Sequence, residues 1–75
     1  MNQQHTNAVE TTAATLAPRE AQVLQHIAAG QTYANTARSM GISVNTVDGY
    51  LRRIRAKTGL RVQAQLVRLA MELQL

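Results

Sequence analysis

The sequence has no cysteine, which excludes a disulfide framework and a zinc site with cysteine ligands. It also lacks an apolar stretch near the ~20 residues that span a bilayer, and its start has neither the basic residues nor the apolar run of a signal peptide. With 75 residues, the chain has room for one small domain with one modest core. We therefore expect a single soluble domain in the cytoplasm.

Side chains that carry out catalysis are scarce. The histidines are His5 and His26, and the 4 acidic residues are too scattered for a helix to align two of them for acid and base chemistry. The sequence contains no Gly-rich phosphate loop, and no group of His and carboxylates has the spacing of metal ligands. We therefore expect that the protein is not an enzyme and that it holds no cofactor and no metal ion.

Positive charge is present in excess. The 8 Lys and Arg against 4 Asp and Glu give a formal net charge of +4, which favours a polyanionic partner. Most of the basic residues fall in one stretch without acidic residues, namely Arg52, Arg53, Arg55, Lys57 and Arg61. The alternative to a binding surface there is a solvated helix face.

Composition divides the chain into an arm and a domain. Residues 1–15 are rich in Asn, Gln, Thr and Ala, so we expect a flexible arm, and without Arg or Lys it is assigned no role in DNA binding. Over residues 16–75, Pro18 suits a first helical turn, and Gly30, Gly41 and Gly59 each suit the left-handed conformation that follows a helix. With no strand pattern in competition, the sequence predicts an all-α domain with helices over about residues 18–29, 33–40, 44–58 and 62–73.

The helix over 44–58 has two chemically different faces. At 100° per residue, one face gathers the apolar side chains Val47, Tyr50, Leu51 and Ile54. The opposite face is polar or small and is edged with positive charge: Asn45, Asp48, Gly49, Arg52 and Ala56, flanked by Arg53 and Arg55. This helix follows a tight turn over residues 40–43. Two helices joined by such a glycine turn form a helix-turn-helix unit, whose second helix enters the major groove of DNA.

The helix over 62–73 carries two apolar stripes. The first contains Val62, Leu66, Leu69, Ala70 and Leu73. The second contains Ala64, Val67, Met71 and Leu75. Since a surface helix needs one stripe to pack on its own domain, the second stripe indicates a partner, most simply the same helix of a second copy. The alternative is that both stripes are buried inside one tight domain.

One series of short motifs and single residues extends over most of the predicted domain. Its members are Leu16-Ala17-Pro18-Arg19-Glu20, Val23-Leu24, Ile27-Ala28-Ala29-Gly30, Ala37, Met40-Gly41-Ile42-Ser43, Asn45-Thr46-Val47, Leu51, Ile54, Lys57 and Gly59. In their order and spacing, the chain from Leu16 to Ala70 resembles the LuxR-type (GerE-like) helix-turn-helix DNA-binding domain family. The resemblance implies that the helix over 44–58 lies in the major groove and that the last helix forms the dimer contact.

The resemblance also implies roles for single residues. Those that face base edges are Asp48, Gly49 and Arg52. Those that lie near phosphates are Thr32, Thr46 and Lys57. Asn45 lies on the same polar face of the helix over 44–58 as the base-facing residues, so we expect it to bind DNA with them. Arg53 and Arg55 are added to the predicted DNA-binding residues because of their charge alone.

Several positions depart from the family pattern in the core and at the first helix. Thr36 and Thr58 stand where Ile and Leu are usual, although each hydroxyl can bond the carbonyl one turn back. Gln63 stands where the family has an Arg that pairs with the equivalent of Glu20. Glu20 is therefore expected to pair with Arg61 or to stay solvated.

Two functions stay open. The first is sequence-specific binding of double-stranded DNA by a small, nucleoid-associated transcription regulator that forms a homodimer. The second is an interaction module that pairs with a larger LuxR-type regulator and blocks it. Asp48 favours the second, because a basic residue is usual there and a carboxylate in the groove gains only by accepting from N4 of cytosine. The lack of a sensor domain before the arm also favours the second function. In its absence we expect either that concentration and dimerisation control the protein or that the sequence is a fragment of a longer chain.

Overall fold

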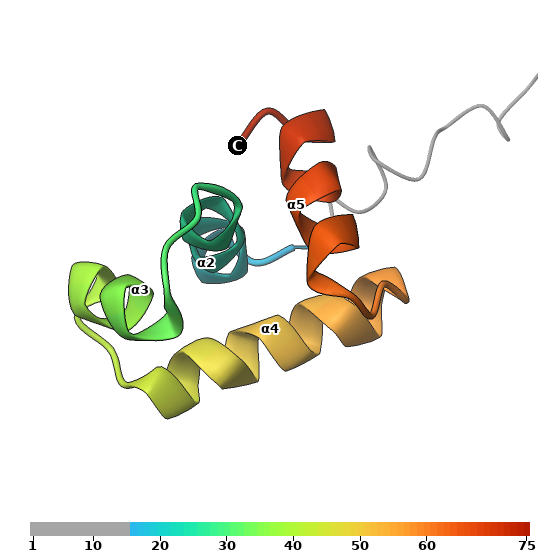
Figure 1. Ribbon diagram of the computed structural model, residues 1–75. Helices are drawn as coiled ribbons and strands as arrows, with labels where there is room; N and C mark the ends of the chain where they lie inside the picture. The colour runs from blue at the N-terminus through green and yellow to red at the C-terminus, as the bar shows by residue number, and fades with distance from the viewer. Residues whose placement is uncertain (1–15) are drawn as a thin grey trace, which may run out of the picture.

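In the computed structural model, which describes residues 16–75, the chain folds into four α-helices with no strand in that range. They are α2 (Pro18–Ala28), α3 (Tyr33–Met40), α4 (Val44–Thr58) and α5 (Gln63–Glu72), as Figure 1 shows. The all-α prediction is confirmed, and each helix begins and ends within one residue of its predicted bounds. The predicted arm over residues 1–15 lies outside the described residues.

Local sequence sets the helix bounds. Thr32 and Ser43 cap α3 and α4, because each hydroxyl accepts from the backbone N–H three residues further on, at 3.0 and 3.1 Å. Gly41 and Gly59 follow these helices with φ of 70° and 76°, a left-handed conformation that glycine adopts without steric cost. The tight turn predicted before α4 is therefore present.

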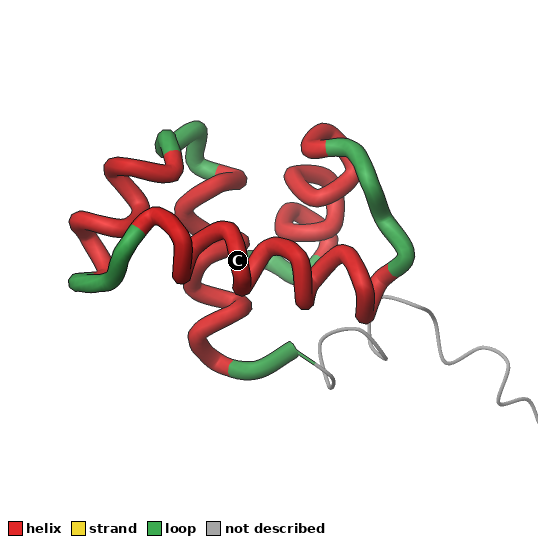
Figure 2. The backbone as a smooth tube through the Cα atoms, turned by 90° about the horizontal axis from the view of Figure 1, so that it is seen from below, coloured by secondary structure: helices red, strands yellow, loops and turns green. Residues whose placement is uncertain are grey.

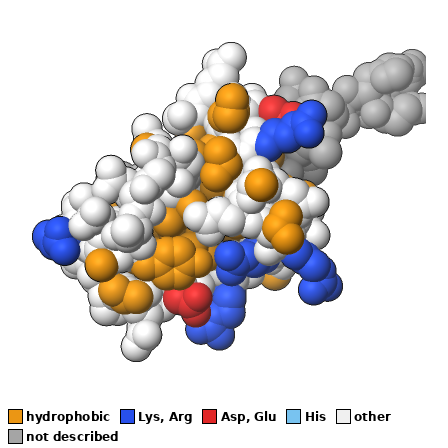
Figure 3. Space-filling view, in the orientation of Figure 1, with side chains coloured by type: hydrophobic (Ala, Val, Ile, Leu, Met, Phe, Trp, Pro, Cys, Tyr) orange, Lys and Arg blue, Asp and Glu red, His pale blue; other side chains and the backbone are white. Residues whose placement is uncertain are grey.

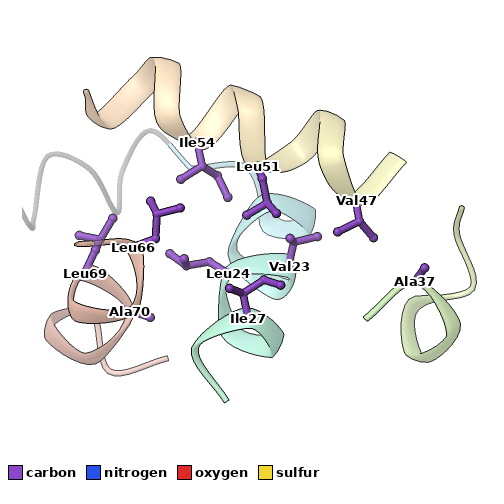
Figure 4. Close-up of a cluster of buried hydrophobic side chains, with 10 residues drawn as sticks. All are labelled: Val23, Leu24, Ile27, Ala37, Val47, Leu51, Ile54, Leu66, Leu69 and Ala70. Atoms are coloured by element: carbon purple, nitrogen blue, oxygen red, sulfur yellow. The ribbon is translucent and has the colours of Figure 1, made fainter. Parts of the chain in front are cut away.

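The core lies where α4 crosses the other helices. In Figure 1, α4 runs beneath α3, α2 and α5, with α2 between the other two, and Figure 2 shows the short loops that join the helices. Figure 4 shows Val47, Leu51 and Ile54 pointing from α4 into the cluster of buried side chains. The other members of the cluster are Val23, Leu24, Ile27, Ala37, Leu66, Leu69 and Ala70. These inward contacts fix the rotation of α4 and hence the face that it turns to solvent.

Two threonines test the expectation that a hydroxyl in the core bonds the carbonyl one turn back. Thr58 confirms it, because its Oγ1 donates to the carbonyl of Ile54 at 2.8 Å and also accepts from the N–H of Leu60 at 3.1 Å. For Thr36 the expectation is wrong, since this side chain is fully buried and its hydroxyl has no hydrogen-bond partner among residues 16–75. A buried hydroxyl without a partner destabilises the fold, because it has left water without replacing its hydrogen bonds.

Thr36→Val is therefore expected to stabilise the protein. Valine has nearly the shape of threonine without the hydroxyl, so the free energy of unfolding should rise by about 1 kcal/mol and the midpoint of thermal unfolding by about 4–8 °C. Thr58→Val is the matched control and should lower the midpoint, because it removes a hydroxyl that is paired. Thermal unfolding followed by circular dichroism measures both. A midpoint for Thr36→Val at or below that of the wild type would contradict the unpaired hydroxyl.

Candidate nucleic-acid interface

The turn between α3 and α4 fixes how these helices meet. The N–H of Ile42, the residue after the left-handed Gly41, donates to the carbonyl of Ala37 at 3.0 Å, and Ser43 then caps α4. The side chain of Ile42 is half-buried and packs against the core. Two helices held by a short glycine turn form a helix-turn-helix unit, and α4 is its second helix.

The side of α4 opposite its buried residues faces solvent, and we call it the outward face. Its exposed members are Asn45, Thr46, Arg52, Arg53 and Ala56, and its half-buried members are Asp48, Gly49 and Arg55. Figure 3 shows Lys and Arg side chains gathered along the lower edge of the molecule, where α4 lies. The structure therefore brings most of the predicted DNA-binding residues onto one accessible surface of one helix.

Gly49 lies in the middle of α4. Glycine in a helix interior costs roughly 1 kcal/mol relative to alanine. A Cβ added at Gly49 would have nothing within 4 Å outside its own helix and chain neighbours. Packing inside the domain therefore gives no reason for a glycine at this position.

The two charged residues at the centre of the outward face bind each other. Oδ2 of Asp48 accepts from Nε of Arg52 at 3.0 Å and lies 2.9 Å from Nη2 of the same residue. The sequence interpretation missed this ion pair, although a spacing of four residues within a helix is the signal for it. Because 73% of the Arg52 side chain and 42% of the Asp48 side chain are exposed, the pair adds little to stability.

Glu20 at the start of α2 is buried, and two groups bind its Oε1: the ammonium of Lys57 at 2.7 Å and the backbone N–H of Ala17 at 2.9 Å. The expectation that Glu20 pairs with Arg61 or stays solvated is wrong, because the packing of α2 on α4 brings Lys57 to it. Arg61 is instead an exposed residue of the loop between α4 and α5. Lys57 is predicted to lie near phosphates, yet in this structure its ammonium binds a buried carboxylate.

Opposing influences act on the pKa of Glu20. Burial alone would raise this pKa, because it disfavours the charged form. The hydrogen bonds from Lys57 and Ala17 and the positive charges of Lys57 and Arg53 favour the charged form, and together they hold the pKa below its ordinary value. Glu20 and Lys57 therefore form an ion pair at neutral pH.

The threonines predicted to lie near phosphates stand at the starts of helices. Thr32 is the cap of α3, and Thr46 lies in the first turn of α4 with its hydroxyl 2.9 Å from that of Ser43. Both residues are exposed. Helix N-termini carry partial positive charge and attract anions, so both threonines lie where a phosphate group would be favoured.

Two further arginines flank the outward face in different surroundings. Arg53 places its guanidinium 5.4 Å from the ring centre of Tyr50, which is half-buried and packs against the core, as its predicted position on the inward face indicates. Arg55 is half-buried, and its Nε has no hydrogen-bond partner within the described part of the chain. It lines a pocket at the end of α4 together with Ala56, Gly59, Leu60 and Arg61.

The two stripes of α5 differ in exposure. Leu66, Leu69 and Ala70 of the first stripe are buried and Leu73 is half-buried. Val62 was expected among them but is 56% exposed, because it precedes α5 as its cap residue. In the second stripe Ala64, Met71 and Leu75 are exposed and Val67 is half-buried. The alternative in which both stripes are buried in one domain is therefore wrong.

Neither a metal site nor a membrane-spanning helix is found within residues 16–75. No group of three or more His, Cys, Asp or Glu in this range could hold a metal ion. No helix in the same range is long and apolar enough to cross a membrane. His26 is half-buried in α2, and His5 lies outside the described residues.

The fold and the outward face define a protein of the helix-turn-helix class. The GerE family, described as bacterial regulatory proteins of the luxR family, matches residues 14–70, so the chain belongs to the LuxR family. This confirms the resemblance seen in the sequence, and it indicates DNA-binding transcription regulation. No curated protein and no solved structure matches the chain.

Proposed function

We propose that this protein binds specific sequences of double-stranded DNA as a transcription regulator, with α4 in the major groove and α5 as the dimer contact. The observation that carries the proposal is the outward face of α4, which is exposed, polar and edged by arginines directly after a helix-turn-helix turn. A major groove about 12 Å wide admits one helix, and phosphates line both walls. A helix that shows small and hydrogen-bonding groups outward, with cations at its margins, fits this environment.

Gly49→Ala is expected to act on folding and on DNA binding in opposite directions. The added methyl group meets nothing within 4 Å outside its own helix and chain neighbours, so the free energy of unfolding should rise by roughly 1 kcal/mol. If α4 lies in the groove, the same methyl group stands between helix and bases, and specific affinity should fall by at least about fivefold. Thermal unfolding and DNA titration of one preparation measure both. A variant that is more stable and binds DNA as tightly as the wild type would contradict close approach at Gly49.

The dimer contact is supported by the exposed stripe of α5. Met71 is 71% exposed, and with Ala64, Val67 and Leu75 it forms an apolar surface that the rest of the domain leaves open. A two-fold dimer brings the same surface of both copies together. Two helix-turn-helix units on a two-fold axis read two half-sites, so the DNA site should be roughly palindromic.

Met71→Glu is expected to abolish this dimer while leaving the monomer folded. A carboxylate facing its own copy across an apolar contact should weaken dimerisation at least about a hundredfold, whereas the monomer holds position 71 in solvent. Sedimentation velocity over a concentration series measures the effect. Gln63→Glu, an equal charge change at an exposed position of α5, is the control and should dimerise as the wild type does. Equal dimerisation of the two variants would place the contact elsewhere.

The rival function is an interaction module that uses α5 to pair with a larger LuxR-type regulator. Two observations favour it: the open stripe of α5, and Asp48, which offsets the charge of Arg52 on the outward face. In that case binding to the partner regulator should be sensitive to Met71→Glu and indifferent to Arg52→Ala. Loss of DNA binding with Arg52→Ala supports the proposed function instead. Met71→Glu should weaken DNA binding too, because the proposed dimer uses the same stripe of α5.

The proposed function is tested by titrating the purified chain against a random pool of double-stranded DNA, with sequencing of the bound fraction at two salt concentrations. A recovered palindromic motif is the expected result, and the distance between its half-sites reports the geometry of the dimer. Weak, salt-sensitive binding without a motif would favour the interaction module, because phosphate contacts alone carry no sequence information.

A further inference from the structure

The ion pair between Asp48 and Arg52 uses one particular edge of the guanidinium group. Both close approaches, 3.0 Å from Nε and 2.9 Å from Nη2, go to the same carboxylate oxygen, Oδ2. A guanidinium carries five N–H groups in one rigid plane. With the Nε and Nη2 side turned to Asp48, Nη1 and the second N–H of Nη2 point away from the carboxylate at the tip of the side chain. That tip is a pair of parallel donors on an exposed residue of the outward face.

A pair of parallel donors at the tip of an arginine matches one base edge in the major groove. Guanine presents O6 and N7 there as two adjacent acceptors, and bidentate contact with arginine is the commonest specific contact to this base. An unrestrained arginine loses side-chain freedom when it makes this contact, whereas an arginine already held by a carboxylate has lost part of that freedom before DNA arrives.

The same ion pair changes what Arg52 contributes by charge. A free arginine on this face attracts every phosphate nearby, whatever the sequence. With the Asp48 carboxylate at 2.9 Å, the pair as a whole carries no net charge, so its attraction to phosphates is weakened while its donors stay available. The expected consequence is weaker nonspecific binding and sharper discrimination between bases.

We propose that Asp48 is a positioning residue for Arg52: it holds the guanidinium tip toward a guanine and reduces its attraction to phosphates. This rests on the proposed function, because it requires α4 to lie in the major groove. It also assigns Asp48 a role other than direct contact with cytosine, which would need the same carboxylate oxygens to accept from N4 of that base.

A second pair with the same spacing serves as a control. Arg68 and Glu72 of α5 are also four residues apart, exposed to a similar degree, and separated by 3.7 Å between Nε and Oε2. Asp48→Ala and Glu72→Ala therefore remove one carboxylate each, change the net charge equally and break one exposed ion pair. Only Asp48→Ala does so on the outward face of α4.

The experiment uses the motif that the wild type selects from random DNA, made as duplexes in which one guanine at a time is replaced by 7-deazaguanine, which lacks the N7 acceptor. At one guanine of each half-site, the wild type and Glu72→Ala are expected to lose about tenfold in affinity, corresponding to about 1.4 kcal/mol. Asp48→Ala should lose threefold or less at that guanine and bind unrelated duplexes more tightly, with a steeper salt dependence. Asp48→Glu, which keeps a carboxylate, should restore most of the discrimination. In an Arg52→Ala background, Asp48→Ala should change the response to 7-deazaguanine no further.

Three results would overturn the assignment, and they are distinguishable. An undiminished tenfold loss for Asp48→Ala would show that Arg52 needs no positioning. A changed preference at a cytosine, with the response to 7-deazaguanine unaltered, would show that Asp48 reads a base directly. A wild type that selects no motif would overturn the proposed function together with this assignment, whereas the first two results leave sequence-specific binding intact.

Discussion

Lys57→Met is expected to lower the free energy of unfolding by about 3 kcal/mol, a large part of the stability of a domain this small. Lys57 lies on α4, yet its ammonium binds Oε1 of Glu20 on α2 at 2.7 Å. The Glu20 side chain is only 4% exposed, so removing the cation leaves a buried carboxylate whose remaining hydrogen-bond donor within residues 16–75 is the backbone N–H of Ala17. Urea unfolding followed by circular dichroism at pH 7 measures the loss.

The partner variant should cost less. The Lys57 side chain is 34% exposed, so after Glu20→Gln the ammonium can turn to water, and the glutamine oxygen still accepts from the N–H of Ala17. The double variant Glu20→Gln, Lys57→Met removes both charges together and should recover much of the loss of Lys57→Met, as is usual when a buried ion pair is replaced by uncharged groups. A double variant as unstable as Lys57→Met alone would show that the lysine acts by packing and not by its charge.

The pH dependence of stability separates charge from packing more directly. In the wild type the pKa of Glu20 is lowered on folding, so the unfolded chain binds more protons as the pH falls. The ion-pair contribution is therefore present above the unfolded pKa of about 4.5 and is lost as the pH falls through the lower folded value. In Lys57→Met the burial of Glu20 is opposed by fewer groups, and we expect its pKa to rise on folding. That variant should then gain stability as the pH falls from 7 toward 5, in a range where the wild type gains none from Glu20.

Much of the fold follows from features that are local in sequence. Thr32 and Ser43 start helices because their hydroxyls bond N–H groups three residues away. Gly41 and Gly59 end these helices because they themselves take the positive φ that follows each one. The inward face of α4 follows from the period of the α-helix, 100° per residue, which places its apolar side chains on one side. Such features do not depend on where other parts of the chain lie, which explains why the helix bounds were predicted to within one residue.

The features that were missed depend on tertiary distances or on side-chain rotation. Glu20 and Lys57 are 37 positions apart, and only the packing of α2 on α4 brings them together. The sequence predicts for both Thr36 and Thr58 a hydrogen bond from the hydroxyl to the carbonyl one turn back. Within residues 16–75, Thr58 makes this bond and Thr36 does not. The pairing of Asp48 with Arg52 was visible in the spacing, but the edge of the guanidinium that it occupies was not. The shared exposed face of α4 therefore follows from the spacing of its residues, whereas the donors that Arg52 leaves unpaired on that face do not.

Arg52→Ala is expected to have the largest effect on DNA binding, weakening affinity for the selected site by about 5- to 150-fold, or about 1–3 kcal/mol. The loss should be confined to one base pair of each half-site, where the preference for guanine should relax. Arg52 is 73% exposed on the outward face, so its removal should leave the midpoint of thermal unfolding nearly unchanged. Titrations of wild type and variant against the selected duplex and single-base variants of it measure the effect.

Two arginines serve as controls and separate base recognition from charge. Arg68→Ala removes the same charge from an exposed i, i+4 pair on α5 and should leave affinity nearly unchanged. Arg53→Ala, at the margin of the outward face, should weaken binding to all sequences alike and reduce the salt slope by about one, because a phosphate contact releases counterions whatever the base sequence. If Arg52→Ala instead behaves as Arg53→Ala should, with uniform loss and a reduced salt slope, then Arg52 binds the backbone. The residue of α4 that reads a base at this position must then be Asn45 or Asp48.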